Sequence, residues 1–292
     1  MSPIRKFQTL LTILLSLTLV LTLTACGAKR VEEPAEPNTV TITFPEGSTV
    51  LQIAQALEEK GVCSAAEFET ACRSVPAGYD RLFGNYDPTG KLFALEGYLF
   101  PDTYEFYLNT DAQTALKRFL DNTNAKITDE DLAAASNMGW TLDQVITLAS
   151  VIQTEAGDPA EMPKVASVFH NRLSSPSFPY LGSDVTRQYI EVKMKEYIQS
   201  QGLDYSALFG SYCTNDGYDR KTMGLPVGAI CNPGKHAIDA TLHPHKDKYY
   251  YFFTDPQGGY HYNEDFNSHA TQYNAYQNMP STTSSTTGKA GA

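Results

Sequence analysis

The N-terminal part of the chain passes from a basic start to an apolar run and then to a polar stretch. Arg5 and Lys6 precede Leu10–Leu23, which holds only apolar residues, Ser and Thr, and small residues surround Cys26. This order is typical of an export signal, here residues 1–26. Residues 27–38 are polar and contain Pro, which predicts a solvated linker. We therefore expect everything after the signal to be exported.

The next residues follow a strand pattern and then a helix pattern. Thr39–Phe44 alternates as Thr-Val-Thr-Ile-Thr-Phe, which is the period of a half-buried strand. After a turn at Pro45-Glu46-Gly47, Ser48 can cap a helix whose apolar positions lie close to a 3.6-residue spacing and which ends at Gly61. These patterns predict a small strand-helix-helix module over residues 39–77.

A turn-rich segment from Gly78 to Gly90 marks the expected boundary of a second, larger domain over residues 85–278. The whole fold is predicted to be α+β, with the small module followed by a larger mixed domain. Residues 279–292 are rich in Ser and Thr and cannot bury a core, so we predict a disordered tail.

The clearest helical pattern follows Thr141, which with Gln144 fits a capping box at a helix start. The helix carries a broad apolar stripe: Leu142, Val145, Ile146, Leu148, Ala149, Val151 and Ile152. Gly157 is expected to end it. The sequence Asp158-Pro159-Ala160-Glu161 predicts a second helix immediately afterwards, with an acidic N-cap and Pro at the first helical position.

Glu155 continues this apolar stripe, and it is the candidate for chemistry. Burial and the negative end of the helix both disfavour an ionised carboxylate, so both raise its pKa. A raised pKa suits a general acid that donates a proton near neutral pH. The alternative is structural: Glu155 could cap the turn between the helices or pair with Lys164 or Arg172. Periodicity alone leaves both interpretations open.

Composition and charge exclude one class of partner. With 22 Lys and Arg against 33 Asp and Glu, the formal net charge is −11, and no basic cluster exceeds a pair. Such a chain lacks the positive surface that neutralises phosphates, so nucleic acid is not an expected partner.

Four cysteines follow Cys26, and an even number in an exported protein suggests disulfides. Three connectivities are possible, and we favour the two local pairs, Cys63 with Cys72 and Cys213 with Cys231. A zinc site is less favoured because the chain has no Cys-x-x-Cys or His-Glu-x-x-His spacing. We expect neither a metal nor an organic cofactor.

The end of the export signal, Leu23-Thr24-Ala25-Cys26, resembles the lipobox of bacterial lipoproteins, in which the Cys is acylated. This resemblance implies lipidation of Cys26 and an anchor on the extracytoplasmic face of the bacterial cell membrane. The alternative is a signal that stays in the membrane as a helix, although the apolar run is short for that.

Five ordered segments resemble the YceG-like endolytic murein transglycosylases. They are Glu96-Gly97-Tyr98-Leu99-Phe100-Pro101-Asp102-Thr103-Tyr104, Ala149-Ser150-Val151-Ile152-Gln153-Thr154-Glu155, Lys164–Leu173, Gly224–Gly234, and His243-Pro244 with Tyr249–Phe253. Residues 39–62 also resemble the LysM-like subdomain that precedes the catalytic region in that family.

The resemblance implies an enzyme that cleaves the MurNAc-GlcNAc bond of nascent peptidoglycan strands and leaves 1,6-anhydro-MurNAc ends. It assigns Glu155 as the single catalytic residue, acting first as acid and then as base, without water. Peptidoglycan glycan strands are the implied substrate, and peptidoglycan synthases are candidate protein partners. One carboxyl used twice departs from the usual two-carboxylate plan of glycosidases.

Three departures from the family pattern bear on the site. Gln153 stands where the family commonly has the first acid of a Glu-x-Glu pair. Gly182 and Val185 replace the Gln and Pro of a Leu-Gln-Ser/Thr-Asp-Pro-Thr motif, which puts the shape of the substrate-side loop in doubt.

The candidate substrate-binding residues are Glu96, Asn171, Ser183, Asp184, Thr186 and Asn232. Each has a plainer interpretation, because Asp, Asn and Ser often form turns and Glu96 could be a structural acid at a strand end. Two rival functions stay open: a wall-binding lipoprotein without turnover, and a solute-binding lipoprotein, which would require two doubly wound lobes.

Overall fold

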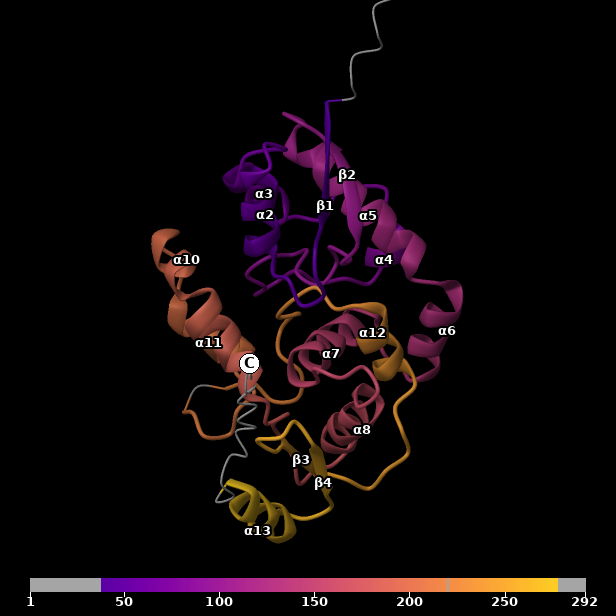
Figure 1. The fold of residues 1–292 in the computed structure, drawn as a ribbon, viewed down its shortest axis with the longest axis vertical. Helices are drawn as coiled ribbons and strands as arrows, with labels where there is room; N and C mark the ends of the chain where they lie inside the picture. Colours follow the sequence, from indigo (N-terminus) through magenta and orange to yellow (C-terminus); the bar gives the residue numbers. More distant parts are fainter. Residues whose placement is uncertain (1–37, 220, 278–292) are drawn as a thin grey trace, which may run out of the picture. The chain divides into compact units, whose positions relative to one another are not determined.

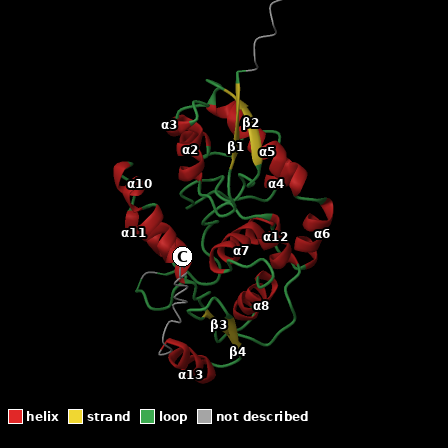
Figure 2. Ribbon diagram, viewed as in Figure 1, coloured by secondary structure: helices red, strands yellow, loops and turns green. Residues whose placement is uncertain are grey.

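The computed structural model describes residues 38–219 and 221–277 (Figure 1). The predicted signal with Cys26, the linker before Asn38 and the predicted tail at 279–292 lie outside these residues. From Thr39 onward the described residues form one compact unit. It is built mostly of helices, with two short pairs of strands among them (Figure 2).

The elements follow one another without an internal repeat. In chain order they are β1 (Thr39–Thr43), α2 (Val50–Glu59), α3 (Ala65–Ala71), α4 (Asp80–Phe83), β2 (Thr103–Tyr107), α5 (Ala112–Lys126), α6 (Asp129–Asn137), α7 (Leu142–Glu155), α8 (Met162–Leu173), α9 (Asp184–Gln188), the π-helical turn η1 (Tyr189–Lys193), α10 (Lys195–Ser200), α11 (Tyr205–Tyr212), α12 (Lys235–Leu242), β3 (Tyr251–Thr254), β4 (Tyr260–Asn263) and α13 (Phe266–Gln277).

The predicted N-terminal strand is confirmed as β1, but its partner lies beyond the boundary expected at residues 78–90. β1 pairs antiparallel with β2, so that Ile42 faces Tyr104 and Thr43 faces Thr103. Tyr104 also packs on Phe119 of α5, with ring centroids 4.5 Å apart. The expected small module and the segment after it therefore share one sheet, which the buried side chains of β1 and β2 stabilise.

Helix α2 starts one residue later than the sequence predicts. Its N-cap is Thr49, whose hydroxyl accepts from the amide of Gln52 while the Gln52 side chain accepts from the Thr49 amide. Ser48 instead donates its hydroxyl to the carbonyl of Pro45 at 2.6 Å. Thr49 forms the capping box because the required Gln lies three residues after it.

Helix α7 matches its prediction closely. Thr141 is the N-cap with a complete capping box, and the helix ends at Glu155. The whole predicted apolar stripe is buried. α7 packs against α8 and α12, and the three helices lie side by side in Figure 1. This packing, more than helix propensity, holds the last turn of α7 in place.

The second helix of this pair does not start at Asp158 as predicted. The Asp158 carboxylate accepts from the amide of Ala160 at 2.9 Å and forms a turn, and α8 begins at Met162 after Glu161. Pro163 takes the early helical position that the sequence suggested for Pro159. An Asp side chain can support a turn or a helix cap with the same type of hydrogen bond, so the pattern alone did not separate them.

The predicted disulfides are not formed. Cys63, Cys72, Cys213 and Cys231 are all free thiols in the described chain. The Cys231 thiol donates to the carbonyl of Ser150 at 3.3 Å, and that of Cys213 points to the carbonyl of Asn215. The two thiols therefore contact separate backbone groups rather than each other.

The α+β class is confirmed, and one rival architecture is excluded. Both sheets in the described residues have two antiparallel strands, β1 with β2 and β3 with β4. The doubly wound lobes of a solute-binding lipoprotein need extended parallel sheets. None of the helices described is long and apolar enough to cross a membrane.

Candidate active site

Glu155 is the last residue of α7, and its carboxylate is half-buried. Its Oε1 atom accepts a hydrogen bond from the Ser183 hydroxyl at 2.6 Å. No salt bridge to Glu155 forms among the described residues: Lys164 pairs with Glu161, and Arg172 donates to backbone carbonyls. The structural alternative, in which Glu155 pairs with Lys164 or Arg172, is therefore not what the fold builds.

The surroundings of Glu155 favour its protonated form. Burial raises the pKa of Glu155, and this outweighs the lowering by the Ser183 hydrogen bond and the Arg172 charge. The Asp184 carboxylate raises the pKa of Glu155 further. Hydrogen bonds from Arg187 lower the pKa of Asp184 itself to about 2, so Asp184 stays ionised. The pKa of Glu155 is thus raised and that of the neighbouring Asp184 is lowered.

The loop that holds Ser183 is fixed by a buried hydroxyl network. Thr186 has no exposed surface, and its Oγ1 donates to the carbonyl of Ser183 at 2.7 Å. Thr214 Oγ1 lies 3.0 Å from Thr186 Oγ1 and also bonds the Ser183 amide. The prediction that Thr186 contacts substrate is wrong for this reason: its hydroxyl lies inside the loop and orients Ser183.

Gly182 explains one departure from the family motif. Its φ of +70° is in the left-handed region, and a Cβ there would lie 3.1 Å from Nη1 of Arg172. A side chain at this position would be strained and would crowd the guanidinium. The loop therefore approaches Arg172 closely because residue 182 is glycine.

Arg172 connects the loop to the C-terminal hairpin. Its Nε donates to the carbonyl of Tyr250 at 2.7 Å, and Nη1 donates to that of Leu181 at 2.8 Å. Burial lowers the pKa of Arg172 to about 10, and the charge of Glu155 opposes this change. The guanidinium stays protonated at neutral pH and supplies a fixed positive charge close to Glu155.

The segment after Glu155 is held by the same hairpin. The amide of Gly157 donates to the Tyr260 hydroxyl oxygen at 2.9 Å. Nearby, the Tyr262 hydroxyl donates to Glu161 at 2.8 Å. Strand β4 therefore positions the residues that follow α7, a contact that no local sequence pattern predicts.

Asn171 lies on α8, and the NH2 group of its side chain is bonded to the backbone. Its Nδ2 donates to the carbonyls of Asp247 at 3.0 Å and Tyr249 at 2.9 Å. This side chain ties the segment before β3 to α8. Asn171 therefore has a supporting role in the fold, and its expected glycan contact stays a prediction.

Glu96 and Asn232 form a buried cluster away from solvent, which we name the Glu96 cluster: Glu96, Asn232, Tyr189 and the amide of Val50. Glu96 is 2% exposed and accepts from Val50 N, Asn232 Nδ2 and Tyr189 Oη, each at 3.0 Å. Burial raises the pKa of Glu96 to about 8, although these hydrogen bonds lower it.

Asn232 completes this cluster and has no exposed surface. Its Oδ1 accepts from the amides of Gly97 at 2.9 Å and Leu99 at 2.8 Å, and its Nδ2 also bonds the Ser48 carbonyl. The predicted substrate contacts at Glu96 and Asn232 are wrong, because their polar atoms are buried and already paired. The cluster instead links the start of α2 to the segments around residues 97 and 232.

The family-like segment Gly224–Gly234 packs against α7. The Ser150 hydroxyl accepts from the amide of Ile230 at 3.0 Å, and Gln153 Oε1 accepts from the amide of Gly234 at 2.9 Å. An amide oxygen serves this second bond, so no carboxylate is required at position 153. Gln153 therefore anchors the start of α12.

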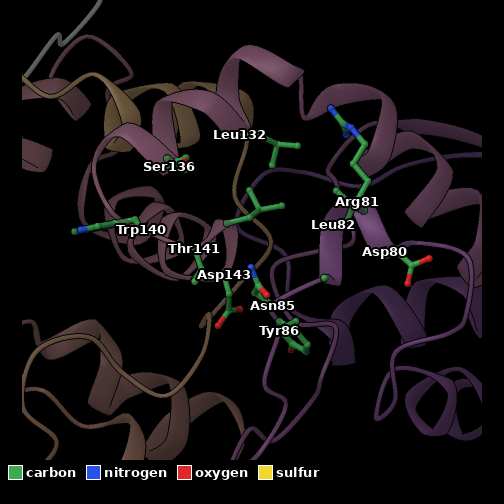
Figure 3. A pocket seen from close by; sticks show the side chains of 13 residues that line it. Asp80, Arg81, Leu82, Asn85, Tyr86, Leu132, Ser136, Trp140, Thr141 and Asp143 are labelled. Carbon is green, nitrogen blue, oxygen red and sulfur yellow. The ribbon is translucent and has the colours of Figure 1, made fainter.

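A separate cavity of about 310 Å³ lies at the opposite end of α7 (Figure 3). Two of its charged groups have protein partners: Arg81 pairs with Asp129, and Asp143 pairs with Lys91. The Trp140 indole points away from Arg81 in Figure 3. Asp143 and Glu155 are twelve residues apart, or about 18 Å along the helix, so this cavity is not part of the Glu155 site.

A groove of about 600 Å³ starts beside the Ser183 loop; we name it the Arg172 groove. Its lining consists of Arg172, Ser177, Phe178, Pro179, Tyr180, Leu181, Gly182, Asn215, Asp216, Tyr251 and Phe266. Gly182 lines it and precedes Ser183, which bonds Glu155. The sequence does not predict this groove, because its walls come from segments far apart in the chain.

Among the predicted residues, the structure brings together Glu155, Ser183 and Asp184. Ser183 is 1% exposed and contacts the acid, and Asp184 is held by Arg187 and Asn215. In residues 38–219 and 221–277, no group of three or more His, Cys, Asp or Glu side chains is arranged to hold a metal ion.

Comparison with known proteins shows the family of this chain. The sequence matches the YceG-like family over residues 21–275, which is most of the chain. The chain belongs to the YceG-like family. This confirms the resemblance that the five sequence segments indicated.

Proteins named endolytic murein transglycosylase are among the relatives in sequence. One from Bacillus subtilis is 30% identical over 225 residues, which cover 74% of this chain and 59% of that protein. One from Streptococcus pneumoniae is 26% identical over 241 residues, covering 78% of this chain and 43% of that protein. The chain therefore spans about half the length of these relatives.

The fold also has a relative among solved structures. The crystal structure of a putative yceG-like protein from Listeria monocytogenes matches with a TM-score of 0.62 and 24% identity. The match covers 80% of this chain and 75% of that one. At this identity the likeness shows a shared fold.

Proposed function

We propose that this chain is a peptidoglycan lytic transglycosylase that cuts the MurNAc-GlcNAc bond within glycan strands. One observation carries the proposal: in a YceG-like chain, Glu155 ends α7 as a half-buried residue with a hydrogen bond from Ser183 and no salt bridge to any described residue. The names of the relatives support the substrate class.

In the first step Glu155 acts as a general acid. Burial raises the pKa of Glu155, which favours a proton on the carboxyl, and the Ser183 bond to Oε1 leaves Oε2 to carry that proton. Transfer to the glycosidic oxygen accompanies cleavage of its bond to C1 of MurNAc. The GlcNAc end leaves as an alcohol, and positive charge develops at C1.

In the second step the same carboxylate acts as a base. The C6 hydroxyl of MurNAc attacks C1, and its proton passes to Glu155, which restores the starting state. The product ring is 1,6-anhydro-MurNAc, and no water is consumed. The fixed charges of Arg172 and Asp184 act on Glu155 in opposite directions, so both its protonated and its ionised forms are accessible.

Two further parts of the proposal concern the N-terminal region. Lipidation of Cys26 would hold the enzyme at the outer face of the cell membrane, near newly made glycan, where peptidoglycan synthases are candidate partners. Helices α2 and α3 follow β1, and β2 pairs antiparallel with β1 after the short helix α4; this arrangement supports a LysM-like module at residues 39–77 extended by β2.

The test is mass spectrometry of uncrosslinked glycan incubated with residues 27–292, wild type beside Glu155→Gln. We expect anhydro-MurNAc ends from the wild type and uncleaved glycan from the variant. Glutamine keeps the size of the side chain but cannot donate and recover the proton, so cleavage should fall at least about 100-fold.

Other products would contradict the proposal in distinct ways. Reducing ends would show hydrolysis by an activated water. Intact glycan that still binds to a folded wild-type protein would support the rival, a wall-binding lipoprotein without turnover.

A further inference from the structure

The Arg172 groove combines aromatic walls with one positive group. Phe178 stacks on Tyr250 at 4.9 Å, and Tyr251 lies 5.9 Å from the ring of Phe266. The Asp216 carboxylate on the groove wall pairs with Lys221 at 2.7 Å, which neutralises its charge. The Arg172 guanidinium is therefore the charge that a ligand in this groove would meet.

Part of the Arg172 guanidinium is left for a ligand. Nε and Nη1 donate to the carbonyls of Tyr250, Leu181 and Gly182. Nη2 has no hydrogen-bond partner within the described part of the chain, and it is not among the buried unpaired atoms. Because the other two nitrogens are held, Nη2 is a pre-oriented donor on the groove wall.

Phe266 supplies an exposed ring at the same groove. Its side chain is 61% exposed, although it is a large apolar residue. An exposed aromatic ring on a groove is a typical platform for the apolar face of a sugar. The groove volume of about 600 Å³ also lies in the range of about 300–1,000 Å³ for small-molecule sites.

We propose that the Arg172 groove recognises MurNAc through its 3-O-lactyl group: Arg172 donates to the lactyl carbonyl oxygen, and Phe266 stacks on the sugar chain. This inference rests on the proposed function and gives it a specificity element. The lactyl carbonyl distinguishes MurNAc from GlcNAc, whether it is a free carboxylate or the amide that carries a peptide.

Binding to Glu155→Gln, which keeps the glycan uncleaved, tests the inference. Three oligomers of equal length serve as probes in calorimetry: peptide-free GlcNAc-MurNAc glycan, the same glycan with its lactyl carboxyl reduced to an alcohol, and a chito-oligosaccharide. We expect the first to bind about tenfold more tightly than the other two, as a hydrogen bond to a charged group allows. Equal affinities would overturn the inference.

Substitutions locate the effect. Arg172→Lys in this background should abolish the preference and leave chito-oligosaccharide binding intact, because Lys keeps the charge without the fixed donor. Phe266→Ala should weaken all three probes about three- to tenfold and keep their ratio. Tyr107→Ala is the matched control, since Tyr107 is 58% exposed on β2 and lies outside the groove lining.

The outcomes remain decisive if Arg172→Lys does not fold, because the three probes and Phe266→Ala leave Arg172 unchanged. An effect of Tyr107→Ala as large as that of Phe266→Ala would exclude the groove. A wild-type protein that cleaves glycan without the preference would contradict only this inference. A preference without cleavage would contradict only the proposed function.

Discussion

Glu155 and Glu96 both have a carboxyl pKa that burial raises, and the two groups lie in contrasting surroundings. Glu155 is half-buried with one hydrogen bond from Ser183. Glu96 is 2% exposed and accepts hydrogen bonds from three protein groups. The same electrostatic signature therefore occurs once at the edge of a groove and once inside the fold.

This difference teaches that a raised pKa alone does not identify a catalytic acid. Removal of water raises the pKa of a carboxyl at a binding site and in a closed protein core alike. What separates Glu155 from Glu96 is a partly exposed side chain, against one that is buried and bonded to three protein groups. Substitutions at the two positions should accordingly change different properties of the protein.

The largest expected effect is on stability at Glu96. Glu96→Ala removes the acceptor of three buried hydrogen bonds and leaves the Val50 amide and the Tyr189 hydroxyl without this partner, so unfolding should cost about 3–5 kcal/mol less. Glu155→Gln should change stability by no more than about 1 kcal/mol. Urea unfolding followed by circular dichroism measures both, and equal losses would remove the distinction between the sites.

A pH dependence of stability should come from Glu96 as well. Its pKa is about 8 in the folded protein and near 4.5 when unfolded, so the folded state binds the extra proton between these values. Unfolding free energy should therefore decrease as pH rises from about 5 to 8, by a few kcal/mol.

Comparison of wild type with Glu96→Gln in urea titrations across this pH range isolates the effect. The amide cannot titrate, so the variant should have the flatter profile. Parallel profiles for the two proteins would show that Glu96 keeps one protonation state throughout.

The smallest expected effect is at Ser183, and it concerns activity. Ser183→Ala removes the hydrogen bond that lowers the pKa of Glu155, so the pKa rises and the alkaline limb of kcat/KM moves to higher pH. Loss of the oriented carboxyl should also reduce kcat about tenfold. Ser183→Thr keeps the hydroxyl and should retain the wild-type pH profile; a shift in both variants would indicate disturbed packing instead.

The local elements were largely predictable from the sequence. The alternation at Thr39–Thr43 and the capping box at Thr141 with Gln144 both identified real elements, because their signals lie within a few residues of each other. The start of α8 was mistaken, since Asp158 could support either a turn or a helix. Pairing of β1 with β2 was missed because it depends on packing across more than sixty residues.

The residues of the candidate site also divide into those that local sequence signals predict and those that only the tertiary structure shows. Glu155 was found from its position on the apolar stripe and from the family segments. Thr186, Glu96 and Asn232 carry the same polar groups as glycan-binding residues, and only their burial showed that they bond to the protein itself. Arg172 and Phe266 could not be assigned to one groove, because no local pattern connects α8 with α13.

By itself the sequence determined the family, the helix that carries Glu155 and the reason for a raised pKa at its end. Tertiary structure decided which polar groups a ligand can reach, that the four cysteines are free thiols, and that Arg172 faces a groove next to the acid. The physical reason is range: helix periodicity and capping act over a few residues, whereas burial and hydrogen-bond pairing depend on segments brought together only by folding.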